Sequence, residues 1–272
     1  MGAERSLSLG PPEADPPTYP TALRALNADG VPYLVGGALA LAAYAGIRRN
    51  TKDLDLFVLP EDARRVLEVL ERAGLHTELP YPHWLGKAYC DAEHVVDVIF
   101  NAGNGAAPVD SEWFAHAPPA IVMNVPVAMC PPEETLWSKA FVMERERFDG
   151  ADIAHLLLAS AELLDWKRLL RRFGDNWRVL YAHLLLFGFA YPDEAHRVPG
   201  WVMRELAELL ESDSSRPPPS ESEHVCKGTL LSREQYLPDL ERGWGDARLQ
   251  PSGTMTREMI AIWTEAIGKR QG

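Results

Sequence analysis

The sequence predicts a mixed α/β sheet domain followed by an all-α helical domain, and three observations lead to this fold class. Apolar strand patterns alternate with helix patterns over residues 21–130. From residue 131 onward the patterns are consecutive helices with short breaks. A chain of 272 residues with 46% hydrophobic and 24% charged content is ordinary for one large or two smaller globular domains.

The elements of the first domain follow from local signals. Residues 1–20 contain several prolines and no apolar signal-peptide segment, so we expect a flexible lead-in before a domain over 21–130. A paired-glycine turn separates a strand from an alanine-rich helix, and a proline, early acidic residues and a final glycine mark a second helix. The predicted helices cover 20–30, 38–46 and 60–74, and the predicted strands cover 32–35, 54–59, 87–90, 94–100 and 120–129. The strands over 87–90 and 94–100 are candidates for a hairpin.

The second domain is predicted over residues 131–211. Its helical patterns cover 132–148, 149–164, 165–174, 176–190 and 199–211. Residues 212–224 are rich in serine and proline, which is typical of a linker or surface loop. Residues 225–272 are too few to form a core of their own, so we expect them to dock on the helical domain.

Charge, cysteine content and the length of apolar runs indicate which partners and which compartment to expect. A formal net charge of −12 disfavours nucleic acid and favours a cationic or neutral small partner or divalent metal ions. Three scattered cysteines indicate reduced thiols, and we therefore expect a cytoplasmic protein. The longest apolar run, residues 33–47, is shorter than the about 20 residues of a membrane span, so no membrane partner is expected.

Paired carboxylates are the most informative feature. Asp53 and Asp55 alternate with leucines on one strand and therefore share a face, and Asp97 interrupts another apolar strand. Two unit charges about 4 Å apart repel by roughly 4 kcal/mol at an effective dielectric constant of about 20. Such a group needs a shared proton or a divalent cation, and oxygen ligands suit Mg²⁺. Gly36 and Gly37, at the start of a helix, would let the backbone approach a phosphate.

These motifs resemble the nucleotidyltransferase superfamily of the DNA polymerase β type. The resemblance rests on V-G-G at 35–37, D-L-D at 53–55 and V-D-V at 96–98. It implies that Asp53 and Asp55 hold two Mg²⁺ ions and that Asp97 completes one metal site near the attacking hydroxyl. It also implies that Gly36 and Gly37 face the triphosphate of a nucleoside triphosphate, the co-substrate.

The spacing R-x-T-x-D-x-D over residues 49–55 is similar to a narrower group, the AbiEii-type toxin nucleotidyltransferases and their relatives. That group also carries a lysine and then an aspartate pair on later helices, and the similarity covers about residues 31–160. Gly37 departs from it, because many members have a serine there. The further residues implied are Arg49, Thr51 and Lys139 at the nucleotide, and Asp149 and Asp152 on the acceptor side.

We interpret the chain as a Mg²⁺-dependent nucleotidyltransferase that moves a nucleoside monophosphate to an acceptor hydroxyl and releases pyrophosphate. The acceptor is a small hydroxylated molecule or a tRNA end, because the acidic charge favours the former and a basic segment over 165–178 favours the latter. The alternative is a non-catalytic binding module of the same fold, antitoxin-like or regulatory.

Structural roles of single residues stay open too. Asp97 could pair with Arg48 or Arg49, and Asp149 and Asp152 could cap a helix. The two tryptophans of 165–178 could belong to the core.

Overall fold

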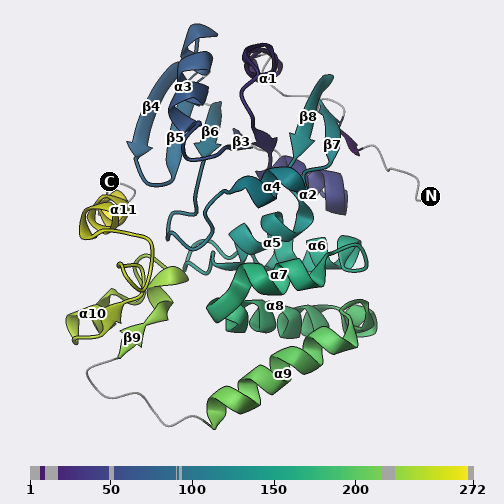
Figure 1. The fold of residues 1–272 in the computed structure, drawn as a ribbon, viewed down its shortest axis with the longest axis vertical. Coiled ribbons are helices and arrows are strands. Elements are labelled where there is room, and N and C mark those ends of the chain that lie inside the picture. The colour runs from purple at the N-terminus through teal and green to yellow at the C-terminus, as the bar shows by residue number, and fades with distance from the viewer. Residues whose placement is uncertain are drawn as a thin grey trace. The chain divides into compact units, whose positions relative to one another are not determined.

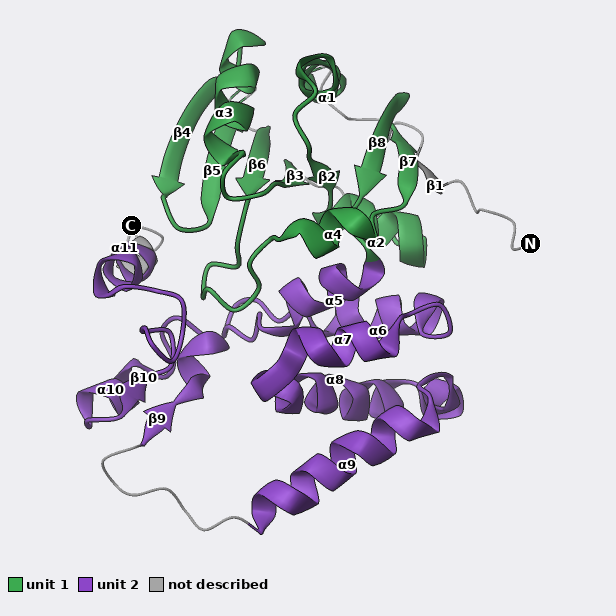
Figure 2. Cartoon of the chain, in the orientation of Figure 1, with its two compact units in different colours: residues 1–131 green, residues 132–272 purple. Residues whose placement is uncertain are grey.

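The computed structural model describes residues 7–9, 18–48, 52–89, 91, 94–215 and 224–268. The chain divides into two compact units, residues 1–131 and 132–272 (Figure 2). The first is built on a mixed sheet and the second is mainly helical (Figure 1), which confirms the predicted fold class. Within the described residues, no helix is both long enough and apolar enough to cross a bilayer.

Unit 1 contains an eight-stranded sheet in the order β1-β7-β8-β2-β3-β6-β5-β4. The pairs β1–β7, β2–β8 and β3–β6 are parallel, and the remaining neighbours are antiparallel. The strands are β1 Leu7–Leu9, β2 Leu34–Val35, β3 Asp53–Phe57, β4 His76–Tyr81, β5 Leu85–Tyr89, β6 Val95–Ile99, β7 Pro119–Val122 and β8 Val125–Met129.

Helices of unit 1 pack on this sheet. The four helices are α1 Thr18–Asp29, α2 Gly37–Ala45, α3 Ala63–Arg72 and α4 Ser111–Ala115. Helix α3 packs on β4, β5 and β6, and α1 packs on α3 and β8. Leu54 and Leu56 of β3 and Val96 and Val98 of β6 are buried in the core that these helices close. The residues between them on the same strands therefore point to the other face.

The structure corrects four predictions in unit 1. Leu7–Leu9 of the supposed lead-in pair with β7, and β4 was not predicted because its residues include exposed His76 and Glu78. Helix α3 begins at Ala63 and not at residue 60, since residues 59–62 form a turn. The single predicted strand over 120–129 is a hairpin, because Met123 and Asn124 take φ values of 50° and 61°, which suit a two-residue turn.

Unit 2 is a series of short helices, and its first one ends earlier than predicted. Helix α5 ends at Ala140 and not at residue 148, because the chain turns and Met143 bridges to Phe148. A two-stranded parallel pair, β9 with β10, also makes the unit slightly less than all-α. The elements are α5 Pro132–Ala140, α6 Gly150–Ser160, α7 Trp166–Phe173, α8 Trp177–Ala190, α9 Gly200–Ser214, β9 Val225–Cys226, α10 Leu237–Glu241, β10 Gly245–Asp246 and α11 Arg257–Gly268, with 3₁₀ turns Gly174–Asn176, Pro192–Arg197 and Lys227–Leu230.

Glu144 connects the C-terminal segment to the helices of unit 2. Its carboxylate accepts a hydrogen bond from the Ser232 hydroxyl at 2.8 Å and from Arg233 Nε at 3.0 Å. The backbone N–H of Met143 also donates to the carbonyl oxygen of Leu231 at 3.1 Å. One acidic side chain thus joins the loop after α5 to residues almost ninety positions later.

We expect Glu144→Ala to lower the free energy of unfolding by about 1 kcal/mol, because hydrogen bonds to a half-buried charged group are lost. Urea unfolding followed by circular dichroism measures this change. Glu146→Ala is the matched control, since Glu146 is exposed two residues away, and it should alter stability by less than about 0.5 kcal/mol. Equal effects of the two substitutions would contradict this role for Glu144.

Candidate active site

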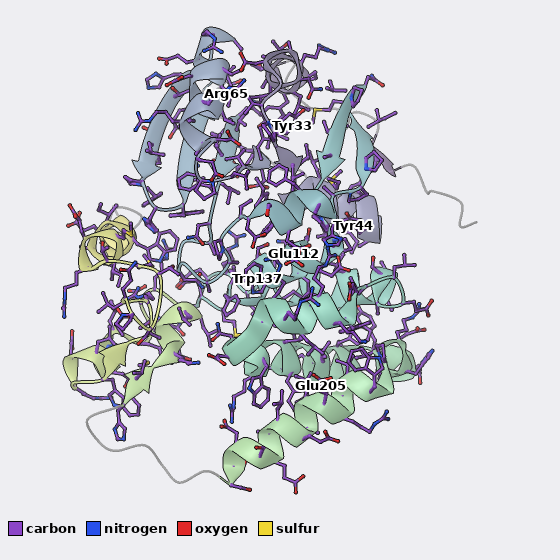
Figure 3. All side chains as sticks on the ribbon, in the orientation of Figure 1. Tyr33, Tyr44, Arg65, Glu112, Trp137 and Glu205 are labelled. Atoms are coloured by element: carbon purple, nitrogen blue, oxygen red, sulfur yellow. The ribbon has the colours of Figure 1, made fainter. Side chains whose placement is uncertain are left out.

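The paired glycines form the turn between β2 and α2. The Gly36 N–H donates to the carbonyl oxygen of Asp55 at 3.0 Å, so the turn is joined to β3. Helix α2 then begins at Gly37, whose φ of +54° lies in the left-handed region that favours glycine. The far end of α2 is held by Tyr44 (labelled in Figure 3), whose hydroxyl donates to the carbonyl oxygen of Cys130 at 2.7 Å.

The space that a side chain on either glycine would need is already filled. A Cβ on Gly37 would lie 1.6 Å from Asp55 Oδ2, and a Cβ on Gly36 would lie 2.4 Å from Phe57 Cε2. The Asp55 carboxylate therefore lies directly against the backbone at the start of α2. This contact explains why the sequence has two glycines before the acidic pair, and why a serine at position 37 would not fit this arrangement.

The acidic face is the face of β3 and β6 that carries Asp53, Asp55 and Asp97. Strands β3 and β6 run parallel, with Asp55 paired in register to Asp97 and Asp53 paired to Val95. The three aspartates thus lie on the side of the sheet away from α1 and α3. Asp53 is exposed and the other two are half-buried. The structure brings together the three residues that the sequence singled out.

A lysine that the sequence analysis missed contacts Asp97. Lys87 of β5 pairs in register with Asp97, and its Nζ lies 2.7 Å from Asp97 Oδ1. This cation is a different one from Arg48 or Arg49, the partners considered from the sequence, and Arg49 lies outside the described residues. The contact follows from the antiparallel register of β5 with β6, in which Lys87 lies directly opposite Asp97, and no sequence motif sets that register.

Burial and neighbouring charges together set the protonation of Asp97. Burial raises the pKa of Asp97 above its ordinary value, Lys87 opposes this by hydrogen bonding and charge, and the charge of Asp53 raises it again. The net direction is upward. A carboxylate with a raised pKa is a stronger proton acceptor than an exposed aspartate.

The donor set of the acidic face fits Mg²⁺ through two carboxylates. Asp53 and Asp55 offer only oxygen ligands from one strand, and Mg²⁺ is commonly held by one or two carboxylates together with substrate phosphates. Across the part of the chain that the structure describes, no three His, Cys, Asp or Glu side chains form a group that could hold a metal ion. In this structure Asp97 Oδ1 is paired with Lys87 Nζ.

The other implied residues lie elsewhere in the chain. Arg49 and Thr51 fall outside the described residues. In unit 2, Lys139 Nζ lies 3.0 Å from Asp149 Oδ2 and 2.9 Å from Asp152 Oδ2. Asp149 precedes α6 but its side chain does not cap that helix. The three residues are thus brought together as an ion-pair cluster between the end of α5 and the start of α6.

The basic segment over 165–178 is partly buried in unit 2, while its Lys167, Arg171 and Arg178 are exposed. Of its two tryptophans, Trp177 is only half-buried, whereas Trp166 is buried and donates from Nε1 to the carbonyl oxygen of Ala161 at 2.9 Å. Arg168 is buried and pairs with Glu133. Arg172 pairs with Glu134 at 3.1 Å and lies 5.2 Å from the centre of the Trp137 ring (labelled in Figure 3). Two of the arginines counted as a basic face are therefore neutralised inside the fold.

Comparison with known proteins identifies the family. A family model described as "uncharacterised nucleotidyltransferase" matches residues 19–187. The chain belongs to this family. The match confirms the nucleotidyltransferase superfamily, while the narrower likeness to AbiEii-type toxins stays a prediction. Among curated proteins no significant match was found.

Solved structures of low sequence identity are also similar to this nucleotidyltransferase-family chain. One is the antibiotic-resistance factor ANT(2'')-Ia, with a TM-score of 0.41 and 20% identity over 61% of this chain and 94% of that chain. Another is the lincosamide antibiotic adenylyltransferase LnuA, with a TM-score of 0.40 and 14% identity over 54% of this chain and 99% of that chain. A third is an antigenic nucleotidyltransferase-like protein from Paracoccidioides brasiliensis, with a TM-score of 0.39 and 14% identity over 66% of this chain and 90% of that chain.

We expect Gly37→Ala to destabilise the protein by about 1–2 kcal/mol for the left-handed backbone and by about 1–3 kcal/mol more for the collision with Asp55. Gly46→Ala is the matched control, because Gly46 has a φ of +70° but open space around its Cβ position. Chemical denaturation of both variants isolates the collision as the difference between them. Equal losses would show that the Asp55 carboxylate does not fill the space beside Gly37.

The ion-pair cluster in unit 2 predicts a pH dependence. Burial would raise the pKa of Asp149, but hydrogen bonds and charge from Arg147 and Lys139 outweigh it and hold the pKa below its ordinary value of 3.8. A depressed pKa stabilises the fold above pH 3.8, and this contribution disappears as pH falls through the pKa of the folded state. Unfolding free energies of wild type and Asp149→Asn should therefore converge on acidification. A constant difference between the two proteins would contradict the charge pairing.

Proposed function

We propose that the chain transfers a nucleoside monophosphate from a nucleoside triphosphate to an acceptor hydroxyl and releases pyrophosphate, in a Mg²⁺-dependent reaction. The observation that carries the proposal is the acidic face, where Asp53 and Asp55 share one side of β3 and Asp97 lies in register on β6. The contact of Asp55 with the backbone of Gly37 adds a helix start beside these carboxylates. Membership of a nucleotidyltransferase family supports the same reaction class.

Each part of the acidic face has a chemical task in this reaction. Asp53 and Asp55 would hold Mg²⁺, which neutralises triphosphate charge and aligns the in-line displacement when bound. The N-terminus of α2 would attract phosphate oxygens through the N–H groups of its first turn. Asp97 accepts the proton of the acceptor hydroxyl as its oxygen bonds to the α-phosphorus and the bond from that phosphorus to pyrophosphate breaks. The resemblance implies two Mg²⁺ ions, and the second requires Asp97 as a ligand.

The charges of the chain favour a small cationic or neutral acceptor over a tRNA end. The net charge of −12 repels a polyanion at long range. Arg168 and Arg172, which suggested an RNA-contacting face, are instead paired with Glu133 and Glu134. A hydroxylated amine of the aminoglycoside kind therefore suits the protein better.

The ion-pair cluster in unit 2 restricts the role of Lys139. Two carboxylates already neutralise its ammonium group, and its side chain is only 14% exposed. A contact between Lys139 and the triphosphate would require this cluster to open. We therefore propose that Asp149 and Asp152 control the availability of Lys139 and reach an acceptor only when the cluster opens.

A direct assay tests the reaction. Each labelled nucleoside triphosphate is incubated with the protein, Mg²⁺, and either a panel of aminoglycosides or total tRNA. We expect label to move onto one acceptor class with release of pyrophosphate, and Asp55→Asn to abolish the transfer. Transfer to tRNA alone would overturn the acceptor preference and leave the reaction class intact.

Thermal melting separates the enzyme from a non-catalytic module. Wild type should gain about 2.7 kcal/mol when Mg²⁺ and the cognate nucleotide stand at about 100 times the dissociation constant. Asp55→Asn keeps the shape that packs against Gly37 but removes a negative charge, so the ligand-free protein should be as stable as wild type or slightly more so. The same variant should lose the nucleotide-dependent gain.

Asp62→Asn is the matched control for this measurement. Asp62 precedes α3 and its side chain makes no capping hydrogen bond, so the variant should respond to Mg²⁺ and nucleotide as wild type does. If wild type shows no Mg²⁺-dependent shift with any nucleotide, the non-catalytic module is the better conclusion. Destabilisation of ligand-free Asp55→Asn with an intact nucleotide response would give Asp55 a structural role only.

A further inference from the structure

A row of charged side chains crosses four neighbouring strands on the acidic face. Asp55 of β3 is in register with Asp97 of β6, Asp97 with Lys87 of β5, and Lys87 with Glu78 of β4. Residues in register on neighbouring strands present their side chains on the same face. Across the row, from β3 to β4, the charged groups are two carboxylates, one ammonium group and a third carboxylate. The one positive charge of the row therefore lies beside the candidate metal ligands.

Lys87 has two carboxylates within reach but bonds to one of them. Its Nζ is 2.7 Å from Asp97 Oδ1, with side chains 25% and 16% exposed respectively. Glu78 lies on its other side and accepts a hydrogen bond from the Tyr89 hydroxyl. Cβ atoms of directly opposed residues in antiparallel strands are about 5 Å apart, and the four-carbon stem of lysine spans that separation easily.

We propose that Lys87 is an internal counter-ion of the acidic face, which occupies Asp97 in the ion-free protein and moves toward Glu78 when a divalent ion binds Asp97. The inference rests on the proposed function, because it concerns the same carboxylates. It goes beyond that function by giving Lys87, which no sequence motif identified, a positioning role that acts through Asp97.

Electrostatics requires such an exchange if Asp97 is to become a metal ligand. An ammonium group in contact with a carboxylate repels a divalent cation that approaches the same group, and this repulsion is large in a half-buried place. Without Lys87, Asp97 would lose the ammonium group that neutralises it in the ion-free protein. Lys87 therefore stabilises the ion-free protein and weakens ion binding by the same contact.

The experiment measures binding of Mn²⁺ alone, without nucleotide, by the loss of its electron paramagnetic resonance signal during titration. We expect Lys87→Met to bind Mn²⁺ about tenfold more tightly than wild type, since a charge-assisted hydrogen bond no longer competes. Lys87→Arg keeps the positive charge in a more rigid pair and should bind Mn²⁺ no more tightly than wild type. Lys87→Gln is a second neutral variant that gives the same answer if Lys87→Met does not fold.

A double variant tests whether the effect acts through Asp97. In an Asp97→Asn background, Lys87→Met should change Mn²⁺ affinity by less than about twofold, because the competing pair is already broken. Lys167→Met is the control for loss of a positive charge, since Lys167 is exposed on α7 in unit 2. It should leave Mn²⁺ affinity unchanged. A tenfold gain that persists without Asp97 would overturn the proposal.

Glu78→Gln tests the second position of the ammonium group. Removing this carboxylate leaves Lys87 without an anionic partner when it leaves Asp97, so Mn²⁺ should bind about threefold more weakly than to wild type. Unchanged Mn²⁺ affinity in Lys87→Met would overturn the counter-ion role, even if nucleotide transfer is normal. Absence of Mn²⁺ binding in every variant, together with absence of transfer, would overturn both this inference and the proposed function.

Discussion

The parallel pairing of β3 with β6 decides which side chains can meet at the candidate active site. Side chains alternate between the two faces of a strand, so a slip of one residue would bury Asp97 in the core and expose Val96 or Val98. The observed register puts four leucine and valine side chains under α1 and α3 and leaves the aspartates on the other face. Burial of the apolar residues therefore fixes the geometry of the acidic ones.

The turn before α2 connects that geometry to the backbone. Gly36 is held to β3 by a hydrogen bond to the Asp55 carbonyl, and the Asp55 carboxylate fills the place of a side chain on Gly37. Any other residue at position 37 would be destabilised twice, by the positive φ and by the collision of its Cβ with Asp55, so both effects favour glycine. The contact between Gly37 and Asp55 thus holds the start of α2 against β3 and places a negative charge beside it. It also explains why glycine and aspartate are both needed in one short stretch of sequence.

Alternation within strands was enough to predict the shared face of Asp53 and Asp55 and the neighbouring position of Asp97. The role of Lys87 was not predictable in the same way, because the register of a hairpin depends on its turn, and the turn between β5 and β6 has no Asn-Gly or Asp-Gly signal. Strand β4 was missed since its exposed polar residues hide the apolar alternation. In unit 2 the sequence could not show that arginines of a basic segment turn inward to Glu133 and Glu134, because such pairing depends on tertiary contacts.

The acidic face must satisfy two opposite electrostatic demands. Without a bound ion, neighbouring carboxylates repel one another, and burial adds a further penalty that raises the pKa of Asp97. With a bound ion, the same carboxylates are needed in their charged form. A fixed arginine pair would meet the first demand and oppose the second, whereas a lysine on a flexible stem between two carboxylates can meet both. Asp53 and Asp55 are then available to an ion at all times, whereas Asp97 can bind the ion only when Lys87 has moved away from it.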